Sequence, residues 1–167
     1  MNTTGIKIAL SALALAGLVT FSGLEARTSA PVGPDLAIAA INGNLTKVDA
    51  LLDSGWSSDT LGRTDSTPLM FAAEHGHMDV VKRLLTSGAD VNAANRWGQT
   101  PVGLAAQWGN TEIVDLLLEN GADPDAAAAN GRTPLTYAAQ YDYTAVAQRL
   151  IDEGAEVDSV DKRGESP

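Results

Sequence analysis

Apolar residues follow two different patterns along this chain of 167 residues. Near the start they form one run, Ile8 to Val19, which only Ser11 and Gly17 interrupt. From about residue 34 onward they fall into short pairs that recur every 33 residues, with polar stretches between them. Apolar residues at this spacing are typical of amphipathic helices with one buried stripe. The second pattern therefore predicts a series of small helical units.

The apolar run near the start predicts a signal peptide. It follows one basic residue, Lys7, and is shorter than the roughly 20 apolar residues that a membrane-spanning helix needs. Small residues then offer cleavage after Ala26 or Ala30. We expect residues 1–26 to be a signal peptide and 27–33 a linker, so that the mature protein is periplasmic or secreted without stable membrane insertion. The alternative is an uncleaved signal anchor that tethers the protein to a membrane.

Four kinds of residue pair keep the 33-residue period in phase, which identifies an internal repeat. They are Thr67-Pro68, Thr100-Pro101 and Thr133-Pro134; Ala72-Ala73, Ala105-Ala106 and Ala138-Ala139; Val80-Val81, Ile113-Val114 and Val146-Ala147; and Leu84-Leu85, Leu117-Leu118 and Leu150-Ile151. A Gly-Ala-acid triplet closes each unit at Gly88, Gly121 and Gly154, and Ser166-Pro167 continues the first kind of pair. The repeat therefore decides the fold.

Each repeated position has a local structural role. Thr67 and its equivalents suit the N-cap of a short helix, with proline at the first helical position, where its missing N–H costs nothing. A tight turn at Gly76 then leads to a second helix, Met78 to Thr86 in this unit, which Gly88 ends. The polar stretch Asp90 to Asn95 predicts a loop or hairpin that leads to the next unit.

At these residues the chain resembles the ankyrin-repeat family, over about residues 34–167. The resemblance implies an all-α fold, an ankyrin-repeat solenoid of helix-turn-helix units with projecting β-hairpin loops. Pro34-Asp35 stands in place of Thr-Pro in the first unit, which we interpret as a capping unit. We expect units at about 34–61, 62–94, 95–127 and 128–160, with the start of a further unit at 161–167.

The chain departs from the family pattern after Thr-Pro-Leu. The family has a histidine there whose hydrogen bonds tie adjacent units together, and this sequence has Met70, Gly103 and Thr136. We therefore expect that network to be absent and stability to be lower. Gly103 within a short helix costs a further 0.5 to 1 kcal/mol, roughly, relative to alanine.

The last unit differs most from the pattern. Asp142 takes the turn position that Gly76 and Gly109 hold in other units, and aspartate tolerates left-handed backbone less well than glycine. We expect the unit at 128–160 to be the least stable. Because the chain stops at Pro167, at the start of another helix, we interpret it as a fragment; the alternative is a frayed natural end.

Charge and composition exclude several classes of function. The 11 Lys and Arg against 21 Asp and Glu give a net charge of -10, which argues against nucleic acid as a partner. There is no cysteine, and His75 and His77 are the two histidines. Disulfides, thiolate nucleophiles and zinc sites built on cysteine or three histidines are therefore excluded.

The two histidines do not predict a catalytic or metal site. They lie two residues apart across a glycine, without a third ligand at a helical offset, and we interpret His77 as a surface residue at the start of the second helix. A catalytic dyad with His75 would need a pocket that a linear solenoid does not supply. The carboxylates of Asp90 and Asp123 recur with the period, so we interpret them as loop structure. We expect no metal, no cofactor and no enzyme activity.

One column, meaning one set of positions 33 residues apart, keeps the period but varies in residue type. His75, Trp108 and Tyr141 stand just before the turn between helices, at the position that in the ankyrin-repeat family faces the binding groove. Large aromatic residues and arginine dominate interface energetics, so we interpret this column as partner-binding. The alternative is that Trp108 and Tyr141 pack on the neighbouring unit. Further candidate binding residues flank the column or lie near hairpin tips: Gln107, Gln140, Arg63, Arg96 and Trp97.

The resulting prediction is a monomeric, non-catalytic protein-protein interaction module in the bacterial envelope. It would bind another protein, of unknown identity, through its groove and hairpin tips. Three alternatives stay open: an inhibitor or immunity protein for a toxin or enzyme, a protective accessory to a redox enzyme as in exported bacterial relatives, or an enzyme. An inhibitor would abolish its partner's activity, an accessory would bind without inhibition, and an enzyme would turn over alone.

Overall fold

The computed structural model describes residues 34–159, 161–164 and 166–167. The expected signal peptide, linker and cleavage sites lie outside these residues. The described part of the chain contains eight α-helices and no strand, so the fold is all-α. None of these helices is both long and apolar enough to cross a membrane.

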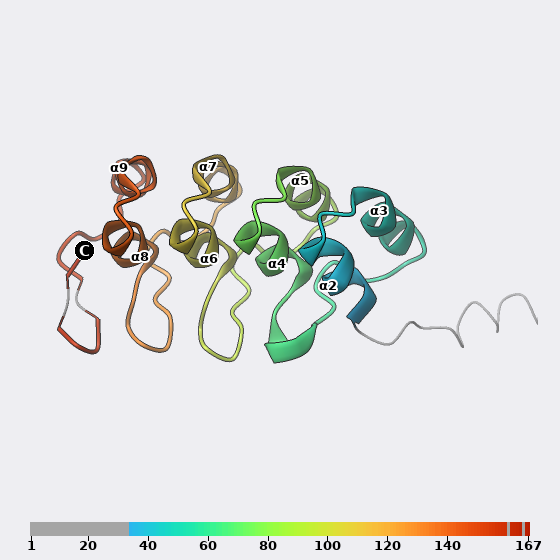
Figure 1. The fold of residues 1–167 in the computed structure, drawn as a ribbon, viewed down its shortest axis with the longest axis horizontal. Coiled ribbons are helices and arrows are strands. Elements are labelled where there is room, and N and C mark those ends of the chain that lie inside the picture. Colours follow the sequence, from blue (N-terminus) through green and yellow to red (C-terminus); the bar gives the residue numbers. More distant parts are fainter. Residues whose placement is uncertain (1–33, 160, 165) are drawn as a thin grey trace, which may run out of the picture. The chain divides into compact units, whose positions relative to one another are not determined.

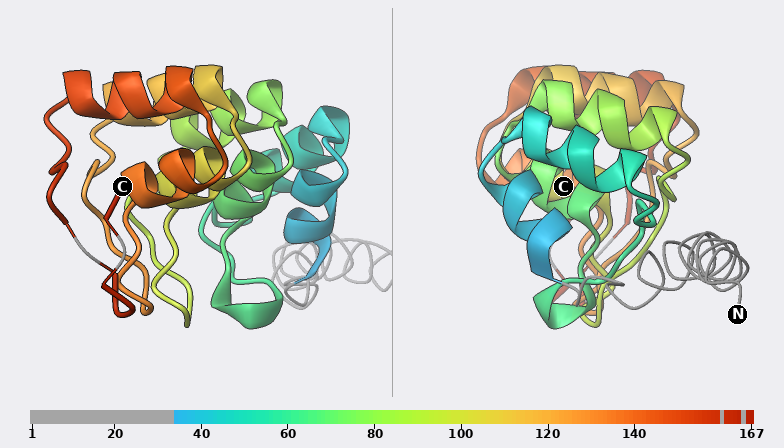
Figure 2. Two further views of the ribbon diagram at one scale, coloured as in Figure 1. Left: turned by 60° about the vertical axis from the view of Figure 1, so that its left-hand side comes forward. Right: turned by 90° about the vertical axis from the view of Figure 1, so that its right-hand side faces the viewer.

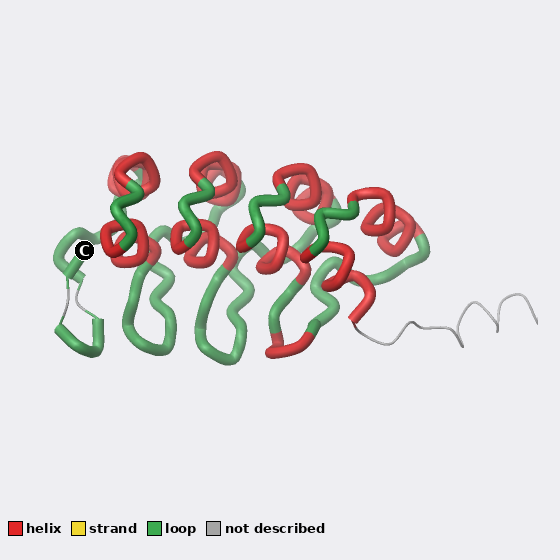
Figure 3. The backbone as a smooth tube through the Cα atoms, in the orientation of Figure 1, coloured by secondary structure: helices red, strands yellow, loops and turns green. Residues whose placement is uncertain are grey.

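The helices form four pairs, each with a first and a second helix joined by a short turn (Figure 1). The first helices lie in one row and the second helices in another, and the loops between pairs project to one side (Figures 2 and 3). A 3₁₀ turn, η1 (Arg63–Asp65), lies in the loop before the second pair. The pairs are α2 (Pro34–Ile41) with α3 (Leu45–Asp53), α4 (Pro68–Glu74) with α5 (Met78–Thr86), α6 (Pro101–Gln107) with α7 (Thr111–Glu119), and α8 (Pro134–Gln140) with α9 (Thr144–Asp152).

Threonine caps start three of the first helices, as predicted. The side chains of Thr67, Thr100 and Thr133 each accept a hydrogen bond from the backbone N–H three residues later, at 3.2 to 3.3 Å. A proline occupies the first turn in each case. The predicted bounds of the second helix α5 are also confirmed.

The turns between paired helices require left-handed backbone. Gly76 and Gly109 have φ of 76° and 70°, and Asp142 adopts a φ of 59° at the same position in the last pair. The following unit packs closely over these turns: a Cβ atom built on Gly109 would lie 2.8 Å from the ring of Tyr143. Glycine at this position therefore serves both the turn and the stacking of units.

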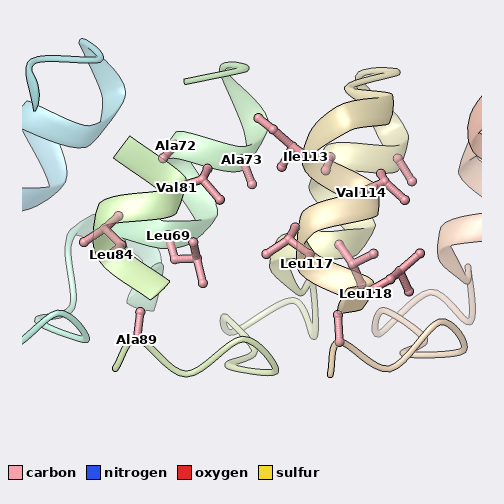
Figure 4. Close-up of a cluster of buried hydrophobic side chains, with 14 of the residues drawn as sticks. Leu69, Ala72, Ala73, Val81, Leu84, Ala89, Ile113, Val114, Leu117 and Leu118 are labelled. Atoms are coloured by element: carbon pink, nitrogen blue, oxygen red, sulfur yellow. The ribbon is translucent and has the colours of Figure 1, made fainter. Parts of the chain in front are cut away.

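A thin hydrophobic core runs between the two rows of helices. The alanine pairs of α4 and α6 are fully buried, and so are Val81 and Leu84 of α5 and Val114 and Leu117 of α7. Figure 4 shows part of this core, with Ala72, Ala73, Val81 and Leu84 in one unit and Val114 and Leu117 in the next. Small residues on the first helices let adjacent units approach closely, and branched residues on the second helices fill the space between them.

Hydrogen bonds from side chain to backbone join successive loops. Asp59, Asn92 and Asp125, which are 33 residues apart, accept from backbone N–H groups of the next unit at 2.8 to 3.0 Å. Asp90 and Asp123 supply two of these N–H groups, and each also accepts a bond from the residue two places later. Their predicted role as loop structure is therefore confirmed.

Arginine side chains join the second helices of neighbouring pairs. Arg83 of α5 contacts Asp49 of α3 at 2.6 Å, and Arg149 of α9 contacts Asp115 of α7 at 2.8 Å. Desolvation lowers the pKa of Arg149, but hydrogen bonds with Asp115 and Glu153 outweigh it and raise that pKa above its ordinary value. These pairs are partly exposed, so they orient neighbouring helices and contribute little to stability.

Candidate binding surface

The column of rings occupies the C-cap of three first helices. His75, Trp108 and Tyr141 end α4, α6 and α8, and their backbone N–H groups bond back into those helices. Trp108 is 55% exposed and Tyr141 is 46% exposed, and His75 is exposed as well. None of the three rings therefore fills the core. The turns that follow them lie on one side of the stack (Figure 1).

Trp108 borders two cavities between the second and third units. One has a volume of about 170 Å³ and is lined by Glu74, Gln107 and Trp97, among others. The other has a volume of about 320 Å³ and is lined by Glu74, His75, Trp108 and Asn110. The structure thus brings four of the predicted residues to this boundary. We call the surface formed by Glu74, Gln107 and Trp108 the Trp108 niche.

Trp97 lies at the tip of the loop before α6. Its backbone N–H bonds to the side chain of Asn95 at 3.0 Å, which shapes the tip, and its ring is 46% exposed. The guanidinium carbon of Arg96 lies 4.4 Å from the centre of that ring, a cation–π contact. A larger cavity of about 540 Å³ is lined by Trp97, by Tyr137 and by residues 128–130 of the next loop, where the Ala129 N–H donates to the Trp97 carbonyl at 2.7 Å. The structure therefore places Arg96 and Trp97 in contact at the loop tip.

In the fourth unit the candidate Gln140 is already engaged. Arg132 donates a hydrogen bond from its Nη1 to the side-chain oxygen of Gln140 and pairs with Asp161 at 3.1 Å. Its guanidinium carbon also lies 5.8 Å from the ring centre of Tyr137. The sequence analysis did not single out Arg132 or Tyr137. The signal for Arg132 was the break in the column of Ser66, Gln99 and Arg132, in which only the last residue is a cation.

The remaining candidate residues, Arg63 and Tyr141, belong to the units before and after the one that contains Trp108. The ring of Tyr141 is 6.1 Å from that of Tyr143 in the fourth unit. Arg63 belongs to the loop of the second unit, in which Thr64 and Asp65 both have positive φ. The side chain of Arg63 is outside the described part of the structure. The predicted set therefore spans three units and has its centre at Trp108.

Both histidines use a ring nitrogen to bind a backbone carbonyl. His75 Nδ1 lies 2.9 Å from the Phe71 oxygen, and His77 Nε2 lies 2.8 Å from the Ile41 oxygen of the preceding unit. A carbonyl only accepts, so each nitrogen carries the proton. His77 starts α5 as predicted, but it is half-buried between two units, which corrects its interpretation as a surface residue. In the parts of the chain described, no three metal-ligating side chains cluster.

Comparison with known proteins identifies one family. A family model for ankyrin repeats (three copies) matches residues 36–128, and a second, overlapping match covers residues 69–161. Together the matches include more than half of the chain and reach from α2 to α9. No curated protein matches the chain.

Proposed function

The chain belongs to the ankyrin-repeat family, and from that premise we propose that it is a non-catalytic module that binds one protein partner through the C-caps of its first helices and the tips of its loops. Ankyrin repeats generally mediate protein–protein interaction. The partner surface would include His75, Trp108 and Tyr141 along the stack, with Arg96 and Trp97 at its edge.

The exposure of the ring column carries this proposal. These exposed rings stand at equivalent positions of adjacent units, unlike the scattered apolar residues of an ordinary surface. Trp108 combines the largest exposed ring with two adjoining cavities that give a partner's side chains room to enter. Aromatic residues bordered by pockets are the usual anchors of protein interfaces.

The cellular setting of this binding rests on the first residues of the sequence. A short apolar run after Lys7, followed by small residues, supports export to the periplasm or beyond. We expect the mature chain to begin at Arg27 or Pro31, which N-terminal sequencing of the exported protein would test. Recovery of an intact Met1 in the membrane fraction would replace the exported protein with an anchored one.

Site-specific crosslinking tests the binding surface. The photoreactive residue p-benzoylphenylalanine would replace Trp108 in the full chain, and in a control it would replace Ile151, which is 42% exposed on the second helix α9. We expect a discrete crosslinked product at position 108 and none at position 151 in the cells that produce the protein. Equal products at both positions, or a product at 151 alone, would move the binding surface elsewhere. If the captured partner is an enzyme, its activity with and without the chain separates an inhibitor from an accessory.

A further inference from the structure

The fourth unit shows how this fold holds a guanidinium group. Arg132 places its side chain against the ring of Tyr137, with Gln140 as one hydrogen-bond acceptor and the buried carboxylate of Asp161 as its ionic partner. Aromatic ring, side-chain amide and carboxylate thus surround one cation. Each component stabilises the positive charge by a different interaction.

The boundary between the second and third units also offers a ring, an amide and a carboxylate, but only its amide, Gln107, stands at an equivalent position, because Tyr137 and Asp161 correspond to Leu104 and Ala128. Shifting Arg132 and Gln140 by 33 residues gives Gln99 and Gln107, and the amide of Gln99 bonds to Asn95 at 3.2 Å. Both glutamines line the cavity of about 170 Å³, and no described residue in its lining is basic. The space beside Gln107 therefore lacks the guanidinium that Gln140 accepts in the fourth unit.

The carboxylate and the ring of the Trp108 niche are both available. The Glu74 side chain has no hydrogen bond or ion pair within the part of the chain that the structure describes, and Gln107 has none either. The indole of Trp97 is covered by Arg96, whereas no arginine or lysine among the described side chains lies over Trp108. Glu74 and Trp108 line both cavities at this boundary, so one entering group can reach the two of them.

We propose that the Trp108 niche binds an arginine side chain of the protein partner, with its guanidinium stacked on Trp108, paired with Glu74 and bonded to the amide oxygen of Gln107. This inference rests on the proposed function and names the chemistry that its central site recognises. A guanidinium fits better than an ammonium because it is planar, stacks on rings and donates in several directions at once. The net charge of -10 favours the approach of a basic partner.

A blocked tripeptide tests this proposal on the full chain. Acetyl-Gly-Arg-Gly-amide would be titrated while NMR follows the indole N–H signals of the three tryptophans, Trp56, Trp97 and Trp108. We expect a saturable shift of the Trp108 signal, with Trp97 and Trp56 changing less. The same peptide with citrulline, which keeps the shape and removes the charge, should shift the Trp108 signal little. The lysine peptide should bind more weakly than the arginine peptide.

Two variants separate the niche from a general effect of charge. Glu74→Gln should weaken binding of the arginine peptide by about fivefold, the effect of one exposed ion pair. Glu119→Gln, which removes an exposed carboxylate from the second helix α7, should leave binding unchanged. Equal shifts with the citrulline peptide, equal weakening by both variants, or no shift at Trp108 would each overturn the proposal. If crosslinking at position 108 succeeds while these titrations fail, the surface binds its partner by other chemistry and only this inference is lost.

Discussion

The buried columns of the stack and its ring column obey different constraints, although both repeat every 33 residues. Leu84 and Leu117 are the same residue type and are both fully buried, whereas the C-cap column changes from His75 to Trp108 to Tyr141 and stays exposed. Where the next unit fills the space, packing fixes the residue type. Where no described residue fills it, packing does not fix the residue type.

The alanine column shows that the neighbour sets this constraint. Ala73 and Ala106 are fully buried, and their helices α4 and α6 pack on the following first helices α6 and α8, but Ala139, the equivalent residue of α8, is exposed. The same residue type on the same helix face therefore has two environments. The predictions below test this comparison by changing residues of each kind, from the largest expected effect to the smallest.

Truncation of a buried residue should have the largest effect on folding. Leu117→Ala removes most of a fully buried side chain between units and should lower the free energy of unfolding by about 2 to 5 kcal/mol. Urea denaturation followed by circular dichroism measures this loss. Partner binding by the protein that stays folded should not change. A loss below about 1 kcal/mol would show that the core at this position collapses around the cavity, and would weaken the comparison.

Truncation of an exposed ring should weaken partner binding and leave the free energy of unfolding nearly unchanged. Trp108→Ala and Tyr141→Ala should each weaken partner binding by about 1 to 3 kcal/mol. Their free energy of unfolding should stay within about 0.5 kcal/mol of the wild-type value, because neither ring fills the core. Calorimetric titration with the partner that crosslinking identifies measures the change in affinity. Urea denaturation measures the free energy of unfolding. If Trp108→Ala unfolds the domain without changing affinity, the indole is structural, and binding must be sought at Arg63, Arg96 and Trp97.

The loop ladder, meaning the hydrogen bonds that Asp59, Asn92 and Asp125 accept from the next unit, should contribute an intermediate amount to stability. Asn92 accepts from the Asp123 N–H and donates to the Gly121 carbonyl, both in the next unit. Asn92→Ala removes both bonds and should cost about 1 to 2 kcal/mol. Hydrogen exchange should show the loss first in the loop at 121–125. Asn120→Ala is the control, because its side chain bonds only within its own unit.

A substitution in the turn of the fourth unit tests whether that unit is the least stable. Asp142 has a left-handed φ of 59°, and Asp142→Gly should raise the free energy of unfolding by about 1 kcal/mol by relieving it. In the wild-type chain, hydrogen exchange should be faster at 128–160 than in the two preceding units. Asp142→Gly should narrow that difference. Uniform protection in the wild-type chain would mean that the fourth unit is covered by an interaction outside the described residues.

Local rules made much of the fold predictable. The threonine caps, the left-handed turn at Asp142 and the bounds of α5 each depend on a few neighbouring residues, and all three predictions are confirmed. The contact of His77 with Ile41 and the loop ladder from Asp59 were not predicted, because they depend on how closely successive units stack. The signal of the loop hydrogen bonds was present in the sequence as a further polar column at 59, 92 and 125.

The candidate site was predictable to a smaller extent. Periodicity located the ring column, because a C-cap before a turn is a position of the repeat. It did not show that Arg132 engages Gln140, or that Glu74 joins Trp108 at two cavities. Both contacts depend on how far long side chains extend and in which direction. That depends on how the units pack, which the spacing of residues in the sequence does not give.

Two glycines of the third unit test directly how repeated and non-repeated positions differ, and the expected changes in stability are small. Gly109 belongs to the repeated turn column, whereas Gly103 stands where other units have Met70 and Thr136. Gly103 is in mid-helix, and a Cβ there would contact only the Thr100 hydroxyl, at 3.4 Å. Gly103→Ala should therefore raise the free energy of unfolding by about 0.5 to 1 kcal/mol.

Gly109→Ala should instead lower the free energy of unfolding by more than about 1 kcal/mol, because it forces a side chain into left-handed backbone and against the ring of Tyr143. Urea denaturation of the two variants side by side gives both values, and the opposite signs are the result that matters. If Gly103→Ala also destabilises the protein, the Thr100 cap does not tolerate the added methyl group. The non-repeated position would then be as constrained as the repeated one, because the cap that starts α6 would limit its size as closely as a neighbouring unit limits the turn.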